Sequence, residues 1–377
     1  MINPILDSNN WAGVPFHFWS VMFFCFGCIV GSFLNVCIHR MPLGESVVSP
    51  PSHCPHCKYS IPWYLNVPLV TWLYLRGKCK NCGAPISMRY FLVELLTGLL
   101  FLGCWLRFGG VSVGLSLAHA LLLAGLMVAT FIDFEHFIIP DEITIGGMAV
   151  GFVCSFALPA LHGQTTLSGA IVQSLLGLGV GAGLIYLILR GGKLLFGKEK
   201  LSLGGETKVV FSETALHLPG REIPYGDLLY RDSDVIQIRA RTVELVDRCY
   251  MDTCVRLSRN CLKIGEEELD PENIVYLEAA CTEVILPREA MGLGDVKFMG
   301  AIGAFLGWQA VLFSLVVSSL IGSLVGITLV IFGRRALSSR LPYGPYIAAA
   351  ATVWIFAGHA LILWYQRLIA NAVGVAH

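Results

Sequence analysis

Residues 113–133 read VGLSLAHALLLAGLMVATFID, an apolar run that contains no Asp, Glu, Lys or Arg until it ends on Asp133. A helix needs about 20 mostly apolar residues to cross a bilayer. A charged group at membrane depth costs about 2.5–3.5 kcal/mol on insertion scales, so a carboxylate at the end of such a run needs a reason. The stretch therefore predicts a membrane-spanning helix and marks Asp133 as a candidate functional residue.

Further apolar stretches repeat this pattern along the chain, in which 55% of the 377 residues are hydrophobic and only 14% are charged. A soluble protein of this length rarely hides so much apolar surface, so an ordinary soluble enzyme is excluded. The predicted spans are Phe16–Val36, Phe91–Arg107, Val113–Ile132, Ile143–Leu161, Gly169–Leu189, Val296–Leu306, Ala310–Phe332 and Tyr346–Trp364. We expect an all-α polytopic membrane protein of about eight transmembrane helices; because the sixth stretch is short, seven is the alternative.

Basic residues in the connecting loops decide between these counts and set the orientation, because cytoplasmic loops are enriched in Lys and Arg. With eight spans, one side collects Arg40, Lys58, Arg76, Lys78, Lys80, Arg89, Arg190, Arg334, Arg335 and Arg340. Only Arg107 and Arg367 fall clearly on the other side. Eight spans therefore place both termini outside. The first 20 residues contain no Lys or Arg, which argues against a secretory signal of the usual form.

Residues 191–290 differ in composition from the rest of the chain. They hold 13 basic and 18 acidic residues, a net charge of −5, whereas the remainder holds 13 and 8, a net charge of +5. Alternating apolar and polar residues, as in Val235–Arg241, are typical of short strands. We expect a small β-rich cytoplasmic insertion with no catalytic, metal or nucleotide motif, and no nucleic-acid partner. The predicted parts are a first helix (1–37), a cysteine-rich cytoplasmic loop (38–90), helices two to five (91–190), the insertion (191–290) and helices six to eight (291–377).

Carboxylates are scarce outside this insertion, and two of them meet at one membrane face in the predicted topology. Asp133 ends the third span, and Asp295 opens the sixth within Gly292–Lys297. Two carboxylates held close together share a proton, so one can take a proton from water while the other polarises a carbonyl. Gly292 and Gly294 would let the backbone approach a substrate closely. The plainer interpretation is that both aspartates only cap or solvate helix ends.

Four cysteines form a second constellation, the pairs Cys54–Cys57 and Cys79–Cys82. Two Cys-x-x-Cys knuckles separated by about 20 residues give four thiolates in tetrahedral reach, the arrangement that structural zinc prefers. Because four thiolates leave no open coordination position, the metal would hold the loop together rather than catalyse. A redox pair or unligated thiols are the alternatives.

Four more residues are candidates for supporting roles. Glu135 and Lys297 lie near the two aspartates in sequence and could tune them. Asp141 follows a proline and fits the N-cap of the fourth span. Glu94 lies just inside the second span, where a structural ion pair or a carboxylate reaching to the interface is expected.

Taken in order, the motifs resemble those of bacterial type IV prepilin peptidases, also called leader peptidases–methyltransferases. The segments that carry the resemblance are Gly31–Val36 with Arg40–Pro42, Ser49–Cys54, Asn66–Pro68 through Arg76–Cys79, Pro85–Tyr90, Glu94–Gly98, Asp133 with Pro140–Asp141, Gly292–Lys297 and Pro342–Tyr346. They cover nearly all of the predicted membrane part.

The resemblance implies a membrane aspartic protease of the bacterial inner membrane, with Asp133 and Asp295 as its catalytic pair at the cytoplasmic face. Its substrates would be prepilins and the pseudopilins of type II secretion, which carry a short basic leader, a glycine and then an apolar helix. Relatives with the cysteine loop commonly also methylate the new N-terminus with S-adenosylmethionine. No glycine-rich fingerprint identifies residues that would bind this methyl donor.

The insertion departs from the family pattern, in which Gly197–Glu199 would run directly into the Gly292–Lys297 segment. It could gate the substrate, bind a pilus or secretion-system partner, or simply be tolerated in a surface loop. Three other functions are alternatives. A presenilin-like intramembrane protease shares the Gly-x-Gly-Asp motif but not the cysteine loop, and a non-catalytic membrane scaffold would be favoured if either aspartate were missing. A transporter would place its carboxylates near the membrane midplane. Asp133 and Asp295 lie at the ends of predicted spans, which disfavours transport.

Overall fold

The computed structural model describes residues 16–229, 234–245, 247–271, 276–287, 292–332 and 341–373. The chain divides into two compact units. The helical unit comprises Met1–Tyr186 and Gly292–His377, and the insertion unit comprises Leu187–Met291. Arg334, Arg335 and Arg340, on which the predicted orientation partly rests, lie outside the described residues.

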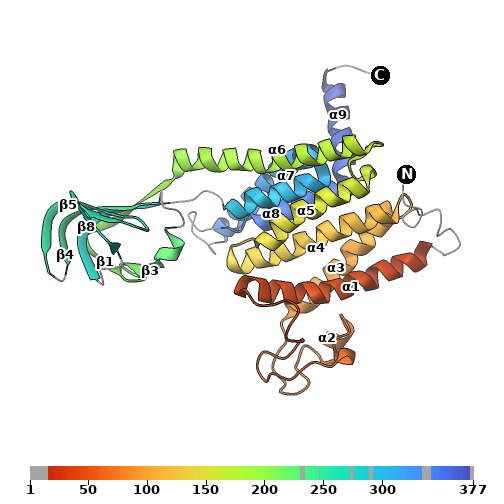
Figure 1. Ribbon diagram of the computed structural model, residues 1–377, viewed down its shortest axis with the longest axis horizontal. Helices are drawn as coiled ribbons and strands as arrows, with labels where there is room; N and C mark the ends of the chain where they lie inside the picture. The colour runs from red at the N-terminus through yellow and green to blue at the C-terminus, as the bar shows by residue number, and fades with distance from the viewer. Residues whose placement is uncertain are drawn as a thin grey trace. The chain divides into compact units, whose positions relative to one another are not determined.

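The helical unit is a bundle of long apolar helices (Figure 1). Its elements are α1 (Phe16–Arg40), η3 (Met41–Leu43), η4 (Trp63–Leu65), α2 (Val70–Tyr74), α3 (Met88–Phe108), α4 (Val113–His136), α5 (Asp141–Ala157), η5 (Pro159–His162), α6 (Leu167–Phe196, which continues into the insertion unit), α7 (Leu293–Ile331), α8 (Gly344–Val353), a π-helical turn (Trp354–Gly358) and α9 (His359–Val373). Within the described residues, five helices are long and apolar enough to cross a membrane: α1, α3, α4, α6 and α7. Counting a bent pair near the C-terminus as one span makes six.

Two features of α5 and α7 explain why this count lies below the eight predicted. The helix α5 has only 17 residues, slightly less than a typical span. The element α7 is two helices joined across a kink at Gly307, where φ is 80°. A Cβ built on Gly303 would lie 3.0 Å from Cγ2 of Val311, although eight residues of straight helix rise about 12 Å. The chain therefore turns back at Gly307, between the predicted sixth and seventh spans.

The last predicted span, Tyr346–Trp364, is not one straight helix. The helical segments Gly344–Gly358 and Ala360–Ile369 meet at 75°. The π-helical turn precedes the bend, and π-turns are common sites of helix distortion. A Cβ on Gly358 would lie 2.5 Å from the Trp354 ring, so the indole packs over a glycine at the bend.

Small residues bring the bundle helices into close contact. A Cβ on Gly31 of α1 would lie 2.8 Å from the Cα of Glu94 on α3. On α6, a Cβ on Gly177 would lie 2.0 Å from the carbonyl oxygen of Gly303. Such small-residue contacts are typical of helices that pack in a bilayer, where van der Waals contact replaces the hydrophobic effect.

The insertion unit contains an eight-stranded antiparallel sheet in the order β3-β2-β1-β8-β4-β5-β6-β7. Its strands are β1 (Lys198–Ser212), β2 (Ala215–Leu218), β3 (Arg221–Pro224), β4 (Ile236–Leu245), β5 (Cys249–Leu257), β6 (Leu262–Ile264), β7 (Glu267–Leu269) and β8 (Tyr276–Pro287), with η6 (Tyr225–Asp227) after β3. Alternate residues of these strands form a buried core, in which Val209, Ile238 and Leu277 are fully enclosed. Lys198 pairs with Pro287, so the chain enters and leaves the unit side by side. Such an arrangement lets a unit be inserted in a loop without separating the flanking helices.

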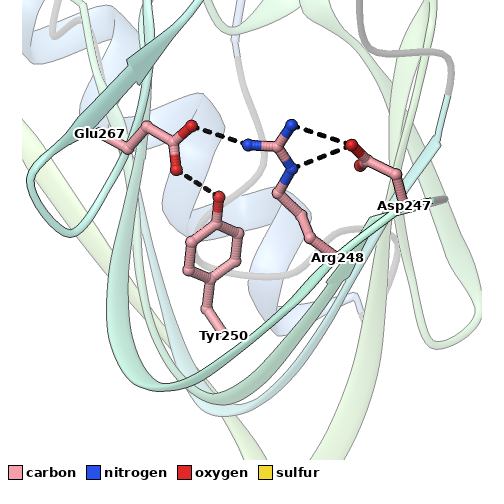
Figure 2. Close-up of polar contacts among 4 residues, drawn as sticks. All are labelled: Asp247, Arg248, Tyr250 and Glu267. Atoms are coloured by element: carbon pink, nitrogen blue, oxygen red, sulfur yellow. Dashed lines mark hydrogen bonds and ion pairs between the residues drawn. The ribbon is translucent and has the colours of Figure 1, made fainter.

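Several exposed carboxylates of the insertion unit pair with basic residues, and Figure 2 shows a connected example. Arg248 donates to Asp247 Oδ2 from Nε at 3.0 Å and from Nη2 at 2.9 Å, and to Glu267 Oε1 from Nη1 at 2.8 Å. The hydroxyl of Tyr250 donates to the other oxygen of Glu267. The Arg248 guanidinium holds the pKa of Asp247 below its usual range.

Candidate active site and metal site

Asp133 lies in the last turn of α4 and is only 6% exposed. Its Oδ2 accepts a hydrogen bond of 2.8 Å from the backbone N–H of Gly344, the first residue of α8. A Cβ on Gly344 would lie 2.7 Å from the same oxygen, so a larger residue could not approach in this way. The contact joins the end of α4 to the start of a helix far along the chain.

Asp295 is the third residue of α7 and is 9% exposed. Its Oδ2 accepts the N–H of the N-cap residue Gly292 at 3.3 Å, as in a capping box. Gly292 has an ordinary extended backbone, with φ −77° and ψ 154°. A Cβ on Gly294 would lie 3.4 Å from the Cβ of Ile139. The structure thus places Gly292 as a cap for Asp295 and Gly294 against the loop that follows α4.

The two aspartates gather at the same end of the bundle. Ile139 lies between their supporting glycines, with its Cδ1 3.1 Å from the Cβ position of Gly344 and its Cβ 3.4 Å from that of Gly294. Among the described residues, neither aspartate forms an ion pair. Two buried carboxylates without a cation favour a shared proton, the arrangement suited to activating water.

The four supporting candidates lie in three separate contacts. Lys297 Nζ donates to Asp141 Oδ1 at 2.7 Å, which links the first turns of α7 and α5. Asp141 was expected to be an N-cap; it is instead the first residue of α5, whose N-cap is Pro140, and its carboxylate is used by Lys297.

Glu135 and Glu94 bind partners on or before α3. Glu135 forms an ion pair with Arg89, so the first turn of α3 meets the last turn of α4. Glu94 is buried, and its Oε2 accepts the backbone N–H of Leu69 at 2.8 Å. The Arg89–Glu135 pair places the cysteine loop, which ends at α3, at the same end of the bundle as Asp133.

Sequence reasoning missed residues that hold these groups through backbone contacts. The N–H of Gly344 supports Asp133, although the only sequence signal was the segment Pro342–Tyr346. Asn35 donates from Nδ2 to the carbonyl of Tyr90 at 3.1 Å. Arg40 donates to the carbonyls of Ser46 and Pro50 at 3.0 and 2.8 Å, which orders the start of the cysteine loop. These contacts give the Gly31–Pro42 motif a structural role.

The four predicted cysteines come together at the tip of two matching turns. Cys54, Cys57, Cys79 and Cys82 place their Sγ atoms within 4.8 Å of one another. In each knuckle the fourth residue after the first cysteine is left-handed, Lys58 with φ 57° and Gly83 with φ 72°. Its N–H donates to the carbonyl of that first cysteine at 2.9 Å in both knuckles.

The spacing of these sulfur atoms fits a tetrahedral metal site. With Zn–S bonds of about 2.3 Å, a tetrahedron has sulfur atoms about 3.8 Å apart. The Cys54–Cys82 and Cys57–Cys79 pairs are 3.8 and 4.0 Å apart. Asn81 donates to Cys57 Sγ at 3.6 Å, and this hydrogen bond is the main cause that lowers the pKa of the Cys57 thiol to about 6. The cluster could therefore bind a metal ion such as zinc through thiolates.

Comparisons with known families agree with this architecture. Residues 25–108 match the bacterial peptidase A24 N-terminal domain. Residues 120–205 and 274–327 match the type IV leader peptidase family, and the break between these two segments falls within the insertion unit. No solved structure matches the chain significantly.

Several curated proteins are similar to this chain. The prepilin leader peptidase/N-methyltransferase of Aeromonas hydrophila is 29% identical over 94% of this chain and 95% of its own length. That of Klebsiella pneumoniae is 38% identical over 51% of this chain and 82% of its own length. That of Myxococcus xanthus is 48% identical, over 41% of this chain and 45% of its own length. The chain therefore belongs to the type IV leader peptidase family.

Proposed function

We propose that this protein is a prepilin peptidase that cleaves type IV prepilins and type II secretion pseudopilins after the leader glycine, with Asp133 and Asp295 as its catalytic pair. The observation that carries the proposal is that two buried carboxylates, from α4 and α7, lie at the same end of the bundle and form no ion pair among the described residues. Membership of the leader peptidase family and the names of the similar proteins support the reaction class.

The chemistry follows from one proton shared by two acids. The ionised carboxylate takes a proton from water, and the resulting hydroxide attacks the carbonyl carbon of the leader glycine. The protonated carboxylate donates a hydrogen bond to the carbonyl oxygen and stabilises the charge that develops there. Collapse of the tetrahedral intermediate breaks the C–N bond, and the amine leaves with a proton from the pair. The N–H groups of Gly344 and Gly292 keep one oxygen of each aspartate in place.

The same proposal sets the topology. We place the protein in the bacterial cytoplasmic membrane with eight spans: α1, α3, α4, α5, α6, the two arms of α7, and α8 with its π-helical turn and α9. The aspartates then lie at the cytoplasmic face, where a basic leader would emerge, together with the cysteine loop and the insertion. The turn at Gly307 and the basic residues of the cysteine loop support this arrangement.

Two further assignments complete the proposed function. Zinc bound by Cys54, Cys57, Cys79 and Cys82 would hold the loop together, since four thiolates leave no position for a substrate. N-methylation of the new N-terminus from S-adenosylmethionine is supported by the names of the similar proteins. The described residues single out no site for this methyl donor. The insertion would gate the substrate, contact a secretion-system partner or be passively tolerated.

Cleavage of a model prepilin in liposomes tests the proposal. We expect the wild-type protein to cut after the leader glycine, and Asp133→Asn and Asp295→Asn to remain inserted but inactive. Glu142→Gln is a matched control, because it removes an exposed carboxylate from the first turn of α5 at the same end of the bundle. Substantial cleavage by either of the first two variants would remove the aspartate pair as the mechanism.

A further inference from the structure

The short segment formed by η4 and α2 is fastened to the side of a membrane helix. The N–H of Leu69, just before α2, is held by Glu94, the seventh residue of α3. Six residues of helix rise about 9 Å, so this contact lies well inside the apolar helix α3. The ring of Trp72 packs on Phe91 of α3 at 5.3 Å, and its Nε1 lies 3.4 Å from the carbonyl oxygen of Ile86. The segment therefore lies beside the beginning of α3 rather than beyond it.

Several apolar side chains of this segment are uncovered. Trp63 is 84% exposed and Tyr74 is 78% exposed. Between them, Tyr64, Val67, Val70 and Leu73 are also exposed. We refer to these six residues as the aromatic surface. Exposed apolar patches of this kind mark a contact with a membrane or another molecule. The segment that carries the aromatic surface contacts α3, a helix long and apolar enough to span a membrane.

Exposed basic side chains lie in the same loop as the aromatic surface. Lys58, Arg76, Lys78 and Lys80 are all exposed, and Lys80 Nζ lies 5.6 Å from the centre of the Tyr64 ring. The sequence from Ser46 to Val93 contains no Asp or Glu. Within the described part of the chain none of these four cations lies in an ion pair. The acids that flank this stretch are Glu45 and Glu94, and Glu94 accepts the N–H of Leu69. The charge is therefore free to meet an external anion.

We propose that the aromatic surface lies in the headgroup region of the bilayer, with the four cations on the phosphates of anionic lipids. Tryptophan and tyrosine favour this region because their rings are amphipathic, and basic side chains beside it are attracted to anionic leaflets. The apolar helix of a precursor would be the competing occupant. A precursor with a basic leader is repelled by the same cations, so the charge favours lipid. The metal-bound loop thereby acts as a membrane contact that holds the start of α3 and the aspartate end of the bundle at the interface.

Tryptophan fluorescence of the full-length, metal-bound protein tests the proposal. The protein is reconstituted in vesicles of phosphatidylcholine and phosphatidylglycerol, with or without bromine on the upper acyl chain. The difference between wild type and Trp63→Phe isolates the emission of Trp63, and Trp72→Phe, whose ring packs inward, is the matched control. We expect brominated lipid to quench Trp63 strongly and aqueous iodide to quench it weakly, with Trp72 quenched less by both.

Two outcomes would overturn the proposal. Iodide quenching of Trp63 without lipid quenching would show a surface in water. Protection from iodide that arises only when prepilin is added would show a protein contact instead. The charge argument has its own test, in which phosphatidylglycerol is omitted. Wild-type quenching of Trp63 should then decrease, whereas a Lys58→Gln, Lys78→Gln, Lys80→Gln variant should respond less to the omission. Because none of these readouts requires cleavage, they stand apart from the proposed peptidase activity.

Discussion

The ion-paired acids of the insertion unit and the two buried aspartates of the helical unit are held in opposite ways. In the insertion unit several exposed acids pair with Lys or Arg, as in the network around Arg248 (Figure 2). Even its buried Asp234 forms an ion pair, with Lys193 at 2.8 Å. In the helical unit, Asp133 and Asp295 are buried, and within the described residues their carboxylates accept hydrogen bonds from backbone N–H groups alone. A carboxylate pair without a cation is costly in a bundle of apolar helices.

This difference separates carboxylates in ion pairs, which contribute to stability, from the two aspartates that we propose to be catalytic. Exposed ion pairs contribute about 0–1 kcal/mol each, so the insertion unit depends on its apolar core and not on any one of them. The aspartates of α4 and α7 have no such partner cation among the described residues. Their arrangement makes sense as pre-organisation for proton transfer, in which stability is given up for reactivity.

The largest effect should come from removing either buried carboxylate. Asp133→Asn or Asp295→Asn should lower the cleavage rate by at least about 10²–10⁴-fold, the usual contribution of a general acid or base. Glu267→Gln, a carboxylate change in the insertion unit, should leave the rate unchanged. Cleavage rates in liposomes, normalised to inserted protein, measure both. A comparable loss in Glu267→Gln would erase the contrast between the two units.

The cysteine loop should respond next most strongly, because the proposed metal would stabilise it in place of an apolar core. Cys54→Ser should release the metal and open the loop to proteases between α1 and α3, with cleavage activity falling as an indirect result. Metal analysis and limited proteolysis of the purified protein report the two effects. Cys104→Ser, a buried cysteine away from the cluster, serves as the control. A loop that stays protected in Cys54→Ser without metal would contradict the structural role.

A smaller effect is expected at the Lys297–Asp141 contact, which is paired like the insertion acids but lies beside the active site. Its side chains are 37% and 60% exposed, so the ion pair should contribute no more than about 1 kcal/mol. If all of that free energy is lost from transition-state stabilisation, kcat/KM falls about fivefold. Lys297→Met should show this decrease. The charge exchange Lys297→Asp with Asp141→Lys should recover part of it, and no recovery would indicate that Lys297 acts on the aspartates directly.

The smallest effect belongs to the network of Figure 2. Arg248→Ala removes contacts to both Asp247 and Glu267, yet all three side chains are substantially exposed. The free energy of unfolding should fall by no more than about 1 kcal/mol, and cleavage should not change. Thermal unfolding followed by the insertion's β-sheet signal measures the first quantity. A loss of cleavage in a folded Arg248→Ala protein would instead assign the network to partner or substrate contact.

The sequence was informative where chemistry requires particular residue types at short spacing. The Cys-x-x-Cys pairs, the apolar helices and the β-rich insertion follow from local pattern, and the structure contains the cysteine cluster, several helices of spanning length and the sheet. Asp133 and Asp295 stand out as candidates in the sequence because a carboxylate at the end of an apolar run is rare.

Contacts between a side chain and a backbone N–H far away in the sequence could not be predicted in this way. Gly344 supports Asp133 and Leu69 is held by Glu94, and in both cases one partner is a main-chain N–H that every residue except proline carries. The bend near Gly358 likewise depends on how Trp354 packs and not on the hydrophobic pattern, which is continuous through it. The exposure of Trp63 and Tyr74 becomes visible only once the metal-ligand knuckles and Leu69 fix the path of the loop.

The pH dependence of kcat/KM for prepilin cleavage tests the central claim most directly. Two interacting carboxylates that must share one proton give a bell-shaped profile whose two limbs belong to the pair. A substrate without ionisable groups near the cut should show this bell with the wild-type protein. A rate that changes through a single ionisation, or that is independent of pH across the carboxylate range, would contradict catalysis by Asp133 and Asp295 acting together.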